Sequence, residues 1–556
     1  MIDEIQLKFG SSPGAPKLAF VPTAVTVFVG PNNAGKSKAI KEIAAQCQHG
    51  QQVPSDVIVE SITFTALGQQ AATSACQQLQ IPPPAGQAVA EGHIFIKTRS
   101  GNRQIFPEHC AKALMEPNTA DWRLAFAEYY LSLQTLVLSG QGRVDLVNDQ
   151  PGGDMQHPPM SSFQKLFRDD PLRDRFSNTV SKSLSGYPVL DPTNLGQLRL
   201  RLSPIKPQSV QVERGLDAAS IAFHGAAQPI TEASDGARAF AGILAEVMAG
   251  DPGILMIDEP EAFLHPSLAY NLGREIVRSL AGSGRHLFVS THSAQFLMGC
   301  LQAGTSVNVV RLTYRDKVAT ARLLPNAEIV KLMRNPLLRS VGVISALFYE
   351  SVVVTEADSD RAFYQEINER LLRDDRGIPN CIFLNAQNKQ TIPTIIEPLR
   401  KLGIPSAGIY DIDLFECGGA EATKIMASAG VPPLSQQPWS NQRGLLLTAL
   451  KKADAQYKRN GGIDVLTDAD KAAAASFLDG LDDYGAFAVR GGELEAWLKH
   501  VHQGGHGPTW LIPMFEAMGE DPTQPDYAAP AVDDVWAFID KVAKWLLDPN
   551  RKGIPT

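Results

Sequence analysis

The sequence predicts an α/β protein with two successive domains, each built around a parallel sheet. An apolar strand at residues 24–29 runs into a glycine-rich loop and then into a segment of helical composition. A second alternation of strands and helices starts near residue 351. The chain of 556 residues is also longer than one hydrophobic core normally supports. We therefore expect an N-terminal domain at 1–345 and a C-terminal domain at 346–556.

The N-terminal domain is expected to consist of a core and a long insertion. The insertion covers residues 50–230, between the glycine-rich loop and the next core helix, and includes an amphipathic helix at 122–138. Polar and apolar residues alternate at 197–202, which predicts a strand. The core then resumes in a helix at 236–249, strands at 254–258 and 286–290, and a β-hairpin at 308–323.

The C-terminal domain begins with a strand–helix–strand–helix–strand pattern, which is typical of a small parallel sheet. Its remaining part has a largely helical composition. The expected core elements are 351–355, 360–372, 381–385, 392–402 and 407–410, and apolar helix faces are expected near 472–481, 494–501 and 535–547.

The composition, with 44% hydrophobic and 20% charged residues, is that of a soluble globular protein. No apolar run approaches the roughly 20 residues of a membrane helix, and the N-terminus lacks a signal-peptide pattern. The six cysteines are scattered without a CxxC pair, which argues against a zinc site or a disulfide framework. We expect a cytoplasmic protein that does not contact membranes. Because the net charge is −8, a nucleic acid must meet a local basic groove or metal ions.

The loop after the first buried strand has the spacing GxxxxGK[ST] of a phosphate-binding loop. Its glycines let main-chain N–H groups surround a phosphate, and the helix N-terminus adds its dipole. Lys36 neutralises phosphate charge, and the hydroxyl of Ser37 is a ligand for Mg²⁺. The alternative is a glycine turn without a ligand, but the flanking strand and helix favour the phosphate loop. The expected ATP-binding residues of the loop are Gly30, Asn32, Asn33, Gly35, Lys36 and Ser37.

An acidic pair closes the strand at 254–258. Asp258 is suited to the Mg²⁺ shell, and Glu259 is suited to polarising the attacking water. Acidic residues also end strands without any ligand, but the phosphate loop upstream favours the nucleotide interpretation. His292 follows the strand at 286–290, where a histidine can contact a γ-phosphate, although a lone histidine there is more often structural.

The segment Ser234-Asp235-Gly236 opens the helix before this acidic strand. Its Ser-x-Gly pattern at a helix N-terminus suits the γ-phosphate of a nucleotide held by a second protomer. Together with the motifs above, in this order, it resembles the ABC-type ATPases of the RecF/SMC kind. The run from Asp258 to Pro266, DEPEAFLHP, is especially similar to the branch that includes the OLD (overcoming lysogenization defect) nucleases.

In that family ATP is bound between two heads, so the resemblance implies a homodimer or a higher homo-oligomer. Two features depart from the family pattern. Ser234-Asp235-Gly236 is a degenerate form of Leu-Ser-x-Gly, and the glutamine loop is not assigned. Both bear on the rate of ATP hydrolysis more than on nucleotide binding.

A second group of acidic residues follows the strands of the C-terminal domain. Glu356 ends the first strand, and Asp360 lies one helical turn further on. Asp411 and Asp413 follow the strand at 407–410, so that both are expected to project on one side. Oxygen ligands from several strand ends suit Mg²⁺ or Mn²⁺, and two such ions can activate water and stabilise the leaving oxygen of a phosphodiester. A capped helix start and a chance Asp-x-Asp are the structural alternatives.

This arrangement resembles the TOPRIM fold shared by topoisomerases, primases and OLD-family nucleases. The resemblance also covers the late segment Gly492-Glu493-Leu494-Glu495, which is similar to a Gly-Glu-Leu-Glu-like segment of the OLD family. Ala357 replaces the glycine that often follows the first glutamate, a departure that concerns loop geometry rather than the ligands. The resemblance implies as metal ligands Glu356, Asp360, Asp411, Asp413 and Glu493.

A lysine that assists catalysis is also plausible in this class. Lys389 is placed to meet a phosphate, and further candidates lie near the C-terminus, although each also fits a solvated helix face. These further candidates are Lys499, Lys541 and Lys544.

The two halves together predict an ATP-regulated endonuclease that uses ATP and Mg²⁺, with Mn²⁺ as an alternative in the second site. Many relatives act in anti-phage defence, so the resemblance implies that role and a second defence protein as a candidate partner. DNA is favoured over RNA, although no residue chooses between them. One alternative is an SMC/RecF-like DNA-repair clamp with a non-cleaving TOPRIM half, which the concentrated negative charge argues against. The other is a partner-triggered RNA (tRNA) nuclease toxin.

Overall fold

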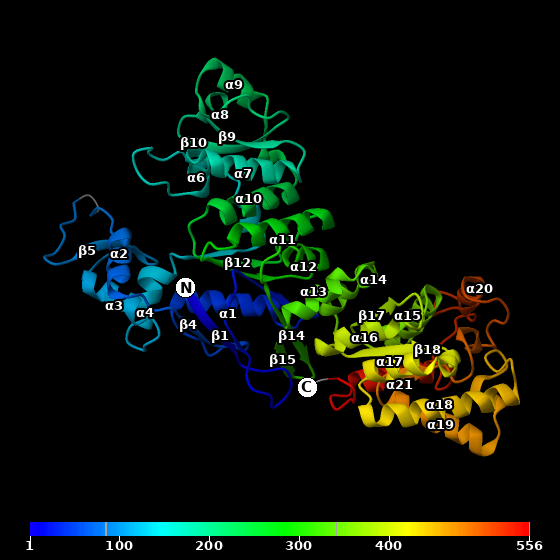
Figure 1. Cartoon of the computed structure of the whole chain (residues 1–556). Coiled ribbons are helices and arrows are strands. Elements are labelled where there is room, and N and C mark those ends of the chain that lie inside the picture. The colour runs from blue at the N-terminus through cyan, green and yellow to red at the C-terminus, as the bar shows by residue number, and fades with distance from the viewer. Residues whose placement is uncertain (84–85, 341, 555–556) are drawn as a thin grey trace. The chain divides into compact units, whose positions relative to one another are not determined.

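The computed structural model describes residues 1–83, 86–340 and 342–554. They form two compact units, Met1–Asn326 and Ala327–Thr556, each with its own sheets and helices (Figure 1). The boundary between the two units, Asn326/Ala327, lies earlier in the chain than the predicted boundary of 345/346. Helices α13 and α14 and the 3-10 helix η3 come before the first strand of the second unit and belong to that unit from Ala327 onward; they span Asn326–Arg334, Pro336–Ser340 and Val343–Phe348.

A six-stranded sheet forms the centre of the first unit. Its strand order is β15-β14-β3-β13-β12-β7; β15 is antiparallel to β14 and the other neighbours are parallel. All five residues of β3 are buried, as expected for a parallel strand with layers on both faces. The strands are β3 (Val25–Val29), β7 (Thr135–Leu138), β12 (Ile254–Asp258), β13 (His286–Ser290), β14 (Asn308–Arg315) and β15 (Val318–Leu323). The predicted strands and hairpin of this core are confirmed.

Helix α1 (Lys36–His49) lies between two sheets. It packs against β12 and β13 and also against β4, in the antiparallel sheet β2-β1-β4. Further helices, α10, α11 and α12, pack in series beside β12 (Figure 1). The bounds are β1 (Ile2–Leu7), β2 (Ala19–Phe20), β4 (Val59–Phe64), α10 (Asp235–Ala249), α11 (Pro266–Leu280) and α12 (Ala294–Leu301).

The prediction of one continuous insertion at 50–230 is wrong, because two of its strands belong to the core. β4 pairs with β1, and β7 pairs with β12. The prediction of one helix over 122–138 is also wrong, because the end of this segment is a core strand. Helix α4 (Arg123–Phe126) and the π-helix η1 (Ala127–Leu131) end before β7, whose apolar residues gain hydrogen-bond partners only beside β12.

The expectation that the cysteines form no disulfide is also wrong. Cys76 and Cys110 are paired, with Cα atoms 6.1 Å apart. They lie on α2 (Gln69–Leu79) and α3 (Pro107–Met115), which pack together. The 34-residue separation between them gave no hint of this pairing, which depends on the packing of the two helices.

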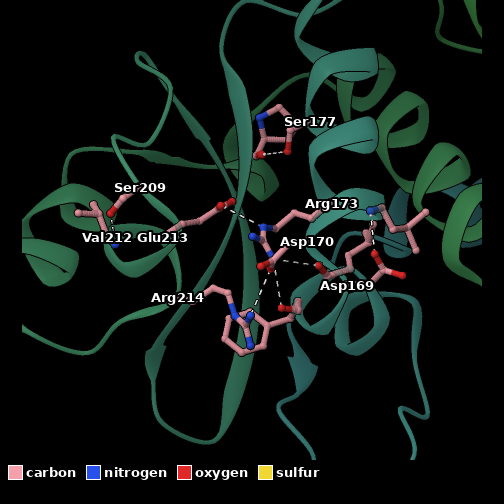
Figure 2. A network of polar contacts seen from close by, with 12 residues as sticks. Asp169, Asp170, Arg173, Ser177, Ser209, Val212, Glu213 and Arg214 are labelled. Atoms are coloured by element: carbon pink, nitrogen blue, oxygen red, sulfur yellow. Dashed lines mark hydrogen bonds and ion pairs between the residues drawn. The ribbon is translucent and has the colours of Figure 1, made fainter.

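The part of the former insertion that follows β7 is a lobe built on the hairpin of β9 (Tyr187–Asn194) and β10 (Gln197–Ser203). A buried ion network joins two of its helices (Figure 2). Nε of Arg173 lies 3.0 Å from Glu213, and its Nη1 lies 2.8 Å from Asp170. Burial raises the pKa of Glu213 despite this pairing. The remaining elements of the first unit are β5 (Ile94–Thr98), β6 (Gly101–Ile105), α5 (Gly140–Asp145), β8 (Gln150–Pro151), α6 (Ser162–Arg168), α7 (Asp170–Ser181), α8 (Val210–Arg214), α9 (Ala218–Gly225), β11 (Gln228–Pro229) and η2 (Ile230–Glu232).

The second unit contains a four-stranded parallel sheet in the order β17-β16-β18-β19. Helices α15 and α21 pack together and against this sheet, and α16 packs against β16, β18 and α17. The predicted strand–helix alternation is confirmed, with small shifts at the ends. Its elements are β16 (Ser351–Thr355), α15 (Asp358–Arg373), β17 (Cys381–Asn385), α16 (Ile392–Lys401), β18 (Ser406–Tyr410) and η4 (Ile412–Glu416).

The C-terminal part is largely helical, as predicted, with two differences. Strand β19 was not predicted, and the helix expected at 494–501 is only a 3-10 turn, η6. None of the helices in the described ranges is long and apolar enough to cross a bilayer. The elements are α17 (Gly419–Ala429), α18 (Pro433–Ala453), η5 (Gly462–Val465), α19 (Asp468–Asp482), β19 (Ala486–Ala488), η6 (Leu494–Ala496), α20 (Pro508–Met518) and α21 (Asp534–Leu547).

Candidate functional site

The phosphate loop joins β3 to α1 in a conformation that depends on its glycines. Gly30 and Gly35 have φ angles of 139° and 90°. A Cβ on Gly30 would lie 2.0 Å from the carbonyl oxygen of Leu312. Nζ of Lys36 donates to the carbonyl oxygens of Gly30 (2.9 Å) and Pro31 (2.7 Å). Burial lowers the pKa of Lys36 to about 8, opposed in part by the acidic residues after β12.

The other predicted residues of the loop surround this lysine. Asn32 and Asn33 are exposed at the tip of the loop, and Ser37 is half-buried in the first turn of α1. The loop therefore offers main-chain N–H groups, one cation and one hydroxyl at a helix N-terminus, which is the donor set that a nucleotide phosphate needs.

The carboxyl ends of β12 and β13 lie beside this loop. The hydroxyl of Ser290 donates to the carboxylate of Asp258, so the two neighbouring strand ends are tied together. Nε2 of His292 lies 3.6 Å from Oε1 of Glu259. Burial lowers the pKa of His292, and the charge of Lys36 lowers it further. The predicted phosphate-loop lysine, acidic pair and histidine thus converge at one place.

Ser234 and Gly236 have clear structural roles within the chain. The hydroxyl of Ser234 accepts a hydrogen bond from the main-chain N of Ala237 (3.3 Å) and caps α10. A Cβ on Gly236 would lie 2.5 Å from the carbonyl oxygen of Phe263, so only glycine lets α10 approach this turn. Contact with a nucleotide on a second protomer stays a prediction for both residues.

The segment after β7 contributes residues that the sequence did not reveal. Nη1 of Arg143 donates to the carbonyl oxygen of Asp258 (2.8 Å) and to that of Glu259. Gln141 precedes it on the same segment, which makes this segment a candidate for the unassigned glutamine loop. One sequence signal could have revealed this segment. The run Thr135–Leu138 is followed by Ser-Gly-Gln-Gly, a pattern that is typical of a short strand followed by a loop.

In the second unit, four predicted carboxylates gather at the carboxyl ends of β16 and β18. Oε1 of Glu356 accepts a hydrogen bond from the main-chain N of Asp411 (3.0 Å). Burial, together with the charges of Asp413 and Asp360, raises the pKa of Glu356 to about 7. Burial likewise raises the pKa of Asp360 to about 6 and that of Asp411 well above its usual value. Raised carboxylate pKa values of this kind indicate that several negative charges lie close together and are shielded from water.

The geometry of Asp411 and Asp413 differs from the prediction. β18 ends at Tyr410, as predicted, but Asp411 precedes the 3-10 helix η4 as its N-cap residue and Asp413 lies within η4, so the extended strand geometry does not continue through them. Asp413 therefore turns toward Lys389, whose Nζ lies 2.7 Å from its Oδ2. Lys458 also approaches Oδ2, at 3.9 Å. Among the described residues no partner is found for the buried Oδ1 of Asp413.

The acidic segment 492–495 also lies beside this carboxylate cluster. The main-chain N of Ile412 donates to the carbonyl oxygen of Gly492 (3.0 Å), and the charge of Glu493 contributes to the raised pKa of Asp411. Two further groups, Glu495 and His506, were not predicted. The ligand atoms of Glu493, Glu495 and His506 lie within 4.8 Å of one another.

These three residues line a cavity of about 280 Å³ together with Lys458 and Lys499. Of the candidate lysines, Lys389 and Lys499 therefore lie near the carboxylates. Lys541 instead pairs with Asp479 (3.0 Å) and Asp482 (2.5 Å) on α19.

Comparison with known proteins agrees with this division of the chain. Residues 208–298 match the family described as "AAA domain, putative AbiEii toxin, Type IV TA system". Residues 347–413 match the "Overcoming lysogenization defect protein-like, TOPRIM domain". A segment of 170 residues is 29% identical to the Old nuclease of Escherichia phage P2 and covers 29% of this chain and 28% of that protein. The match thus spans less than a third of the length of this curated relative.

Solved structures of SMC heads are similar at low identity. A head bound to the C-winged helix domain of ScpA is 14% identical with a TM-score of 0.33; the match covers 59% of this chain and 99% of that one. The head domain from Thermotoga maritima is 16% identical with a TM-score of 0.28, covering 58% and 99%. The chain thus carries an ATPase domain followed by an OLD-like TOPRIM domain, and part of it is similar to Old nuclease.

Proposed function

We propose that this protein is an ATP-regulated endonuclease that cuts nucleic acid with divalent metal ions. The observation that carries the proposal is the cluster of Glu356, Asp360, Asp411 and Asp413 at one edge of the TOPRIM sheet. Burial raises the pKa of the first three, so the ionised cluster is unfavourable unless cations join it. A module that only binds nucleic acid gains nothing from such a concentration of negative charge.

The donor set fits Mg²⁺ or Mn²⁺. The carboxylates of Glu356, Asp360, Asp411, Asp413 and Glu493 supply hard oxygen ligands, and the buried Oδ1 of Asp413 is left without a protein donor in the described part of the chain. Bound divalent ions lower the pKa of water and stabilise charge on a leaving oxygen. Lys389 and Lys458 add positive charge beside Asp413, where a phosphodiester needs a counter-charge.

In the first unit, we propose that the phosphate loop holds ATP with Mg²⁺. Lys36 would meet the phosphates, Ser37 and Asp258 would hold the metal, and Glu259 would orient the attacking water next to His292. The glycine-dependent loop and the pairing of His292 with Glu259 support these roles. Ser234 and Gly236 are proposed to complete the site of a second protomer, so that ATP sets the geometry of a homodimer.

The biological role is proposed from the family alone. We propose anti-phage defence in the cytoplasm, with DNA as the first candidate substrate and a second defence protein as a candidate trigger.

The test is a cleavage assay with purified protein. Supercoiled plasmid and total tRNA are incubated with Mg²⁺ or Mn²⁺, with and without ATP, beside the Asp411→Ala variant. Cleavage that disappears in Asp411→Ala supports the nuclease and identifies its polymer. Cleavage of tRNA alone favours the RNA-toxin alternative. Metal-independent DNA binding without any cleavage favours the clamp alternative.

A further inference from the structure

Glu261 is a largely buried carboxylate that joins the turns after β12 and β13. Its Oε1 accepts hydrogen bonds from the hydroxyl of Thr291 and from the main-chain N of His292, both at 2.8 Å. Its other oxygen, Oε2, is also buried, and no donor to it is found in the described ranges of the chain. One carboxylate oxygen thus holds two consecutive residues of the neighbouring turn.

The turn that carries Glu261 is fixed from the other side by Arg143. This guanidinium holds the carbonyl oxygens of Asp258 and Glu259, and the charge of Glu261 is the main one that favours its protonated form. Glu259 has a φ of 53°, a conformation that a non-glycine residue keeps only when its surroundings enforce it. Arg143 thus supports the turn that carries both Glu259 and Glu261.

The contacts of Glu261 continue into the next helix. The hydroxyl of Thr291 also accepts a hydrogen bond from the main-chain N of Ser293 (3.0 Å). The hydroxyl of Ser293 in turn caps α12 by accepting from Phe296 (3.1 Å). Glu261 therefore holds the main chain of His292 directly, and that of Ser293 only through the hydroxyl of Thr291.

We infer that Glu261 is a positioning residue, which holds the main chain of His292 so that the imidazole meets Glu259 and the γ-phosphate. Hydrogen bonds from main-chain N–H to a carboxylate are stronger than those to a neutral acceptor and fix the donor closely. The inference rests on the proposed ATPase function. Because Glu261 is not expected to contact ATP, its substitution should affect ATP hydrolysis and leave ATP binding largely unchanged.

The first experiment compares Glu261→Ala, Glu261→Gln, His292→Ala and the double variant Glu261→Ala/His292→Ala. The rate constant of ATP hydrolysis and the Kd of a fluorescent ATP analogue are measured for each. Glu275→Ala on α11, whose carboxylate pairs with Arg274 and Arg278, is the matched control. We expect Glu261→Ala to lower kcat by about 10- to 100-fold, because misplacement of reacting groups has that effect. The Kd should change little, and Glu261→Gln should restore most of the rate.

The double variant tests whether Glu261 acts through His292. If it does, Glu261→Ala lowers kcat strongly in the wild-type background and hardly at all in His292→Ala. Independent effects of the two substitutions would overturn the inference, as would an unchanged kcat in Glu261→Ala.

Amide hydrogen exchange supplies a readout that does not require activity. In the protein without nucleotide, peptides covering residues 291–293 should exchange faster in Glu261→Ala than in the wild type, and Glu261→Gln should keep the protection. Unchanged exchange in Glu261→Ala overturns the positioning contact itself. If the wild-type protein binds ATP but never hydrolyses it, the proposed ATPase fails and the inference fails with it. Normal wild-type hydrolysis with an unaffected Glu261→Ala defeats the inference alone.

Discussion

The main-chain N–H of Asp411 donates a 3.0 Å hydrogen bond to the carboxylate of Glu356. The bond ties the carboxyl ends of β18 and β16, which are neighbours in the parallel sheet. One acidic residue is thus oriented by the backbone of another in the same cluster. Acceptor geometry and negative charge at Glu356 can therefore be separated by substitution.

Glu356→Gln keeps an oxygen that can accept from Asp411 but removes the charge that a metal ion needs. We expect metal-dependent cleavage to fall by about 100-fold or more, since even outer-shell changes at metal sites cost 10–100-fold. The unfolding temperature should stay equal or rise, because one crowded charge is gone. Plasmid cleavage and calorimetry measure both effects. Asp483→Asn, an exposed acid paired with Lys552, is the control that should cleave normally. Wild-type cleavage by Glu356→Gln would remove this residue from the metal site.

A rise in pH should destabilise the metal-free second unit, and binding of a divalent metal should stabilise it. Burial raises the pKa of Glu356 to about 7 and that of Asp360 to about 6. The folded, metal-free state therefore binds protons more tightly than the unfolded state does, and this stabilisation is lost as pH rises through 6 to 7.

In EDTA, we expect the unfolding temperature to fall between about pH 5 and pH 8. Mg²⁺ or Mn²⁺ should raise it most at the upper end, where metal no longer competes with protons. Differential scanning calorimetry at several pH values checks this. The variant Glu356→Gln/Asp411→Asn should lose the response to metal and keep only the part of the pH dependence that comes from Asp360. An unfolding temperature that ignores both metal and EDTA at pH 8 would argue against a metal site here.

Long apolar strands and glycine motifs could be predicted from the sequence, because their signals are local. Strand β19 (Ala486–Ala488) could not, because three apolar residues gain strand character only by pairing with β18. Arg143 and Glu261 were missed for a related reason. Their partners lie far along the chain or are main-chain atoms, which no side-chain pattern records. The Asp-x-Asp after β18 was found, but the 3-10 helix η4 that starts at Ile412 was not predicted, because its first turn has no distinctive local pattern.

Substitution of Gly236 should affect stability before it affects any nucleotide contact. A Cβ there meets the carbonyl oxygen of Phe263 at 2.5 Å, and main-chain atoms cannot yield as a flexible side chain can. We expect Gly236→Ala to destabilise the first unit by about 1–3 kcal/mol. Gly225→Ala, at a helical position with no atom within 4 Å of the added Cβ, should be close to neutral. Denaturant unfolding measures both. Equal stability of the two variants would contradict the close approach of α10 to this turn.

The pairing of Cys76 with Cys110 can be counted directly. The structure leaves free thiols at Cys47, Cys300, Cys381 and Cys417. Protein purified without reductant and then denatured should label at four cysteines, and at six after reduction, because only the paired sulfurs are protected. Mass spectrometry of the labelled protein makes the count. Six labelled thiols without reduction would restore the original expectation of a fully reduced chain.

Arg143 should matter for ATP hydrolysis although it lies outside every motif. It holds the carbonyl oxygens of Asp258 and Glu259, and Glu259 needs that support to keep its φ of 53°. Without the guanidinium, the turn can relax and carry the carboxylate of Glu259 away from the attacking water. We expect Arg143→Ala to lower kcat by about 10- to 100-fold. The affinity for ATP should change little, because the phosphate loop does not depend on this contact.

Arg168→Ala is the matched control for Arg143→Ala. Arg168 also holds two main-chain carbonyl oxygens, those of His157 and Asp154, but its partners belong to the lobe rather than to the nucleotide site. Steady-state hydrolysis and analogue binding on both variants separate loss of a general main-chain tether from loss of this one. An equal fall in both would make Arg143 a generic stabilising contact. A selective fall in Arg143→Ala, with the Kd preserved, would tie hydrolysis to the conformation of the Asp258–Glu259 turn.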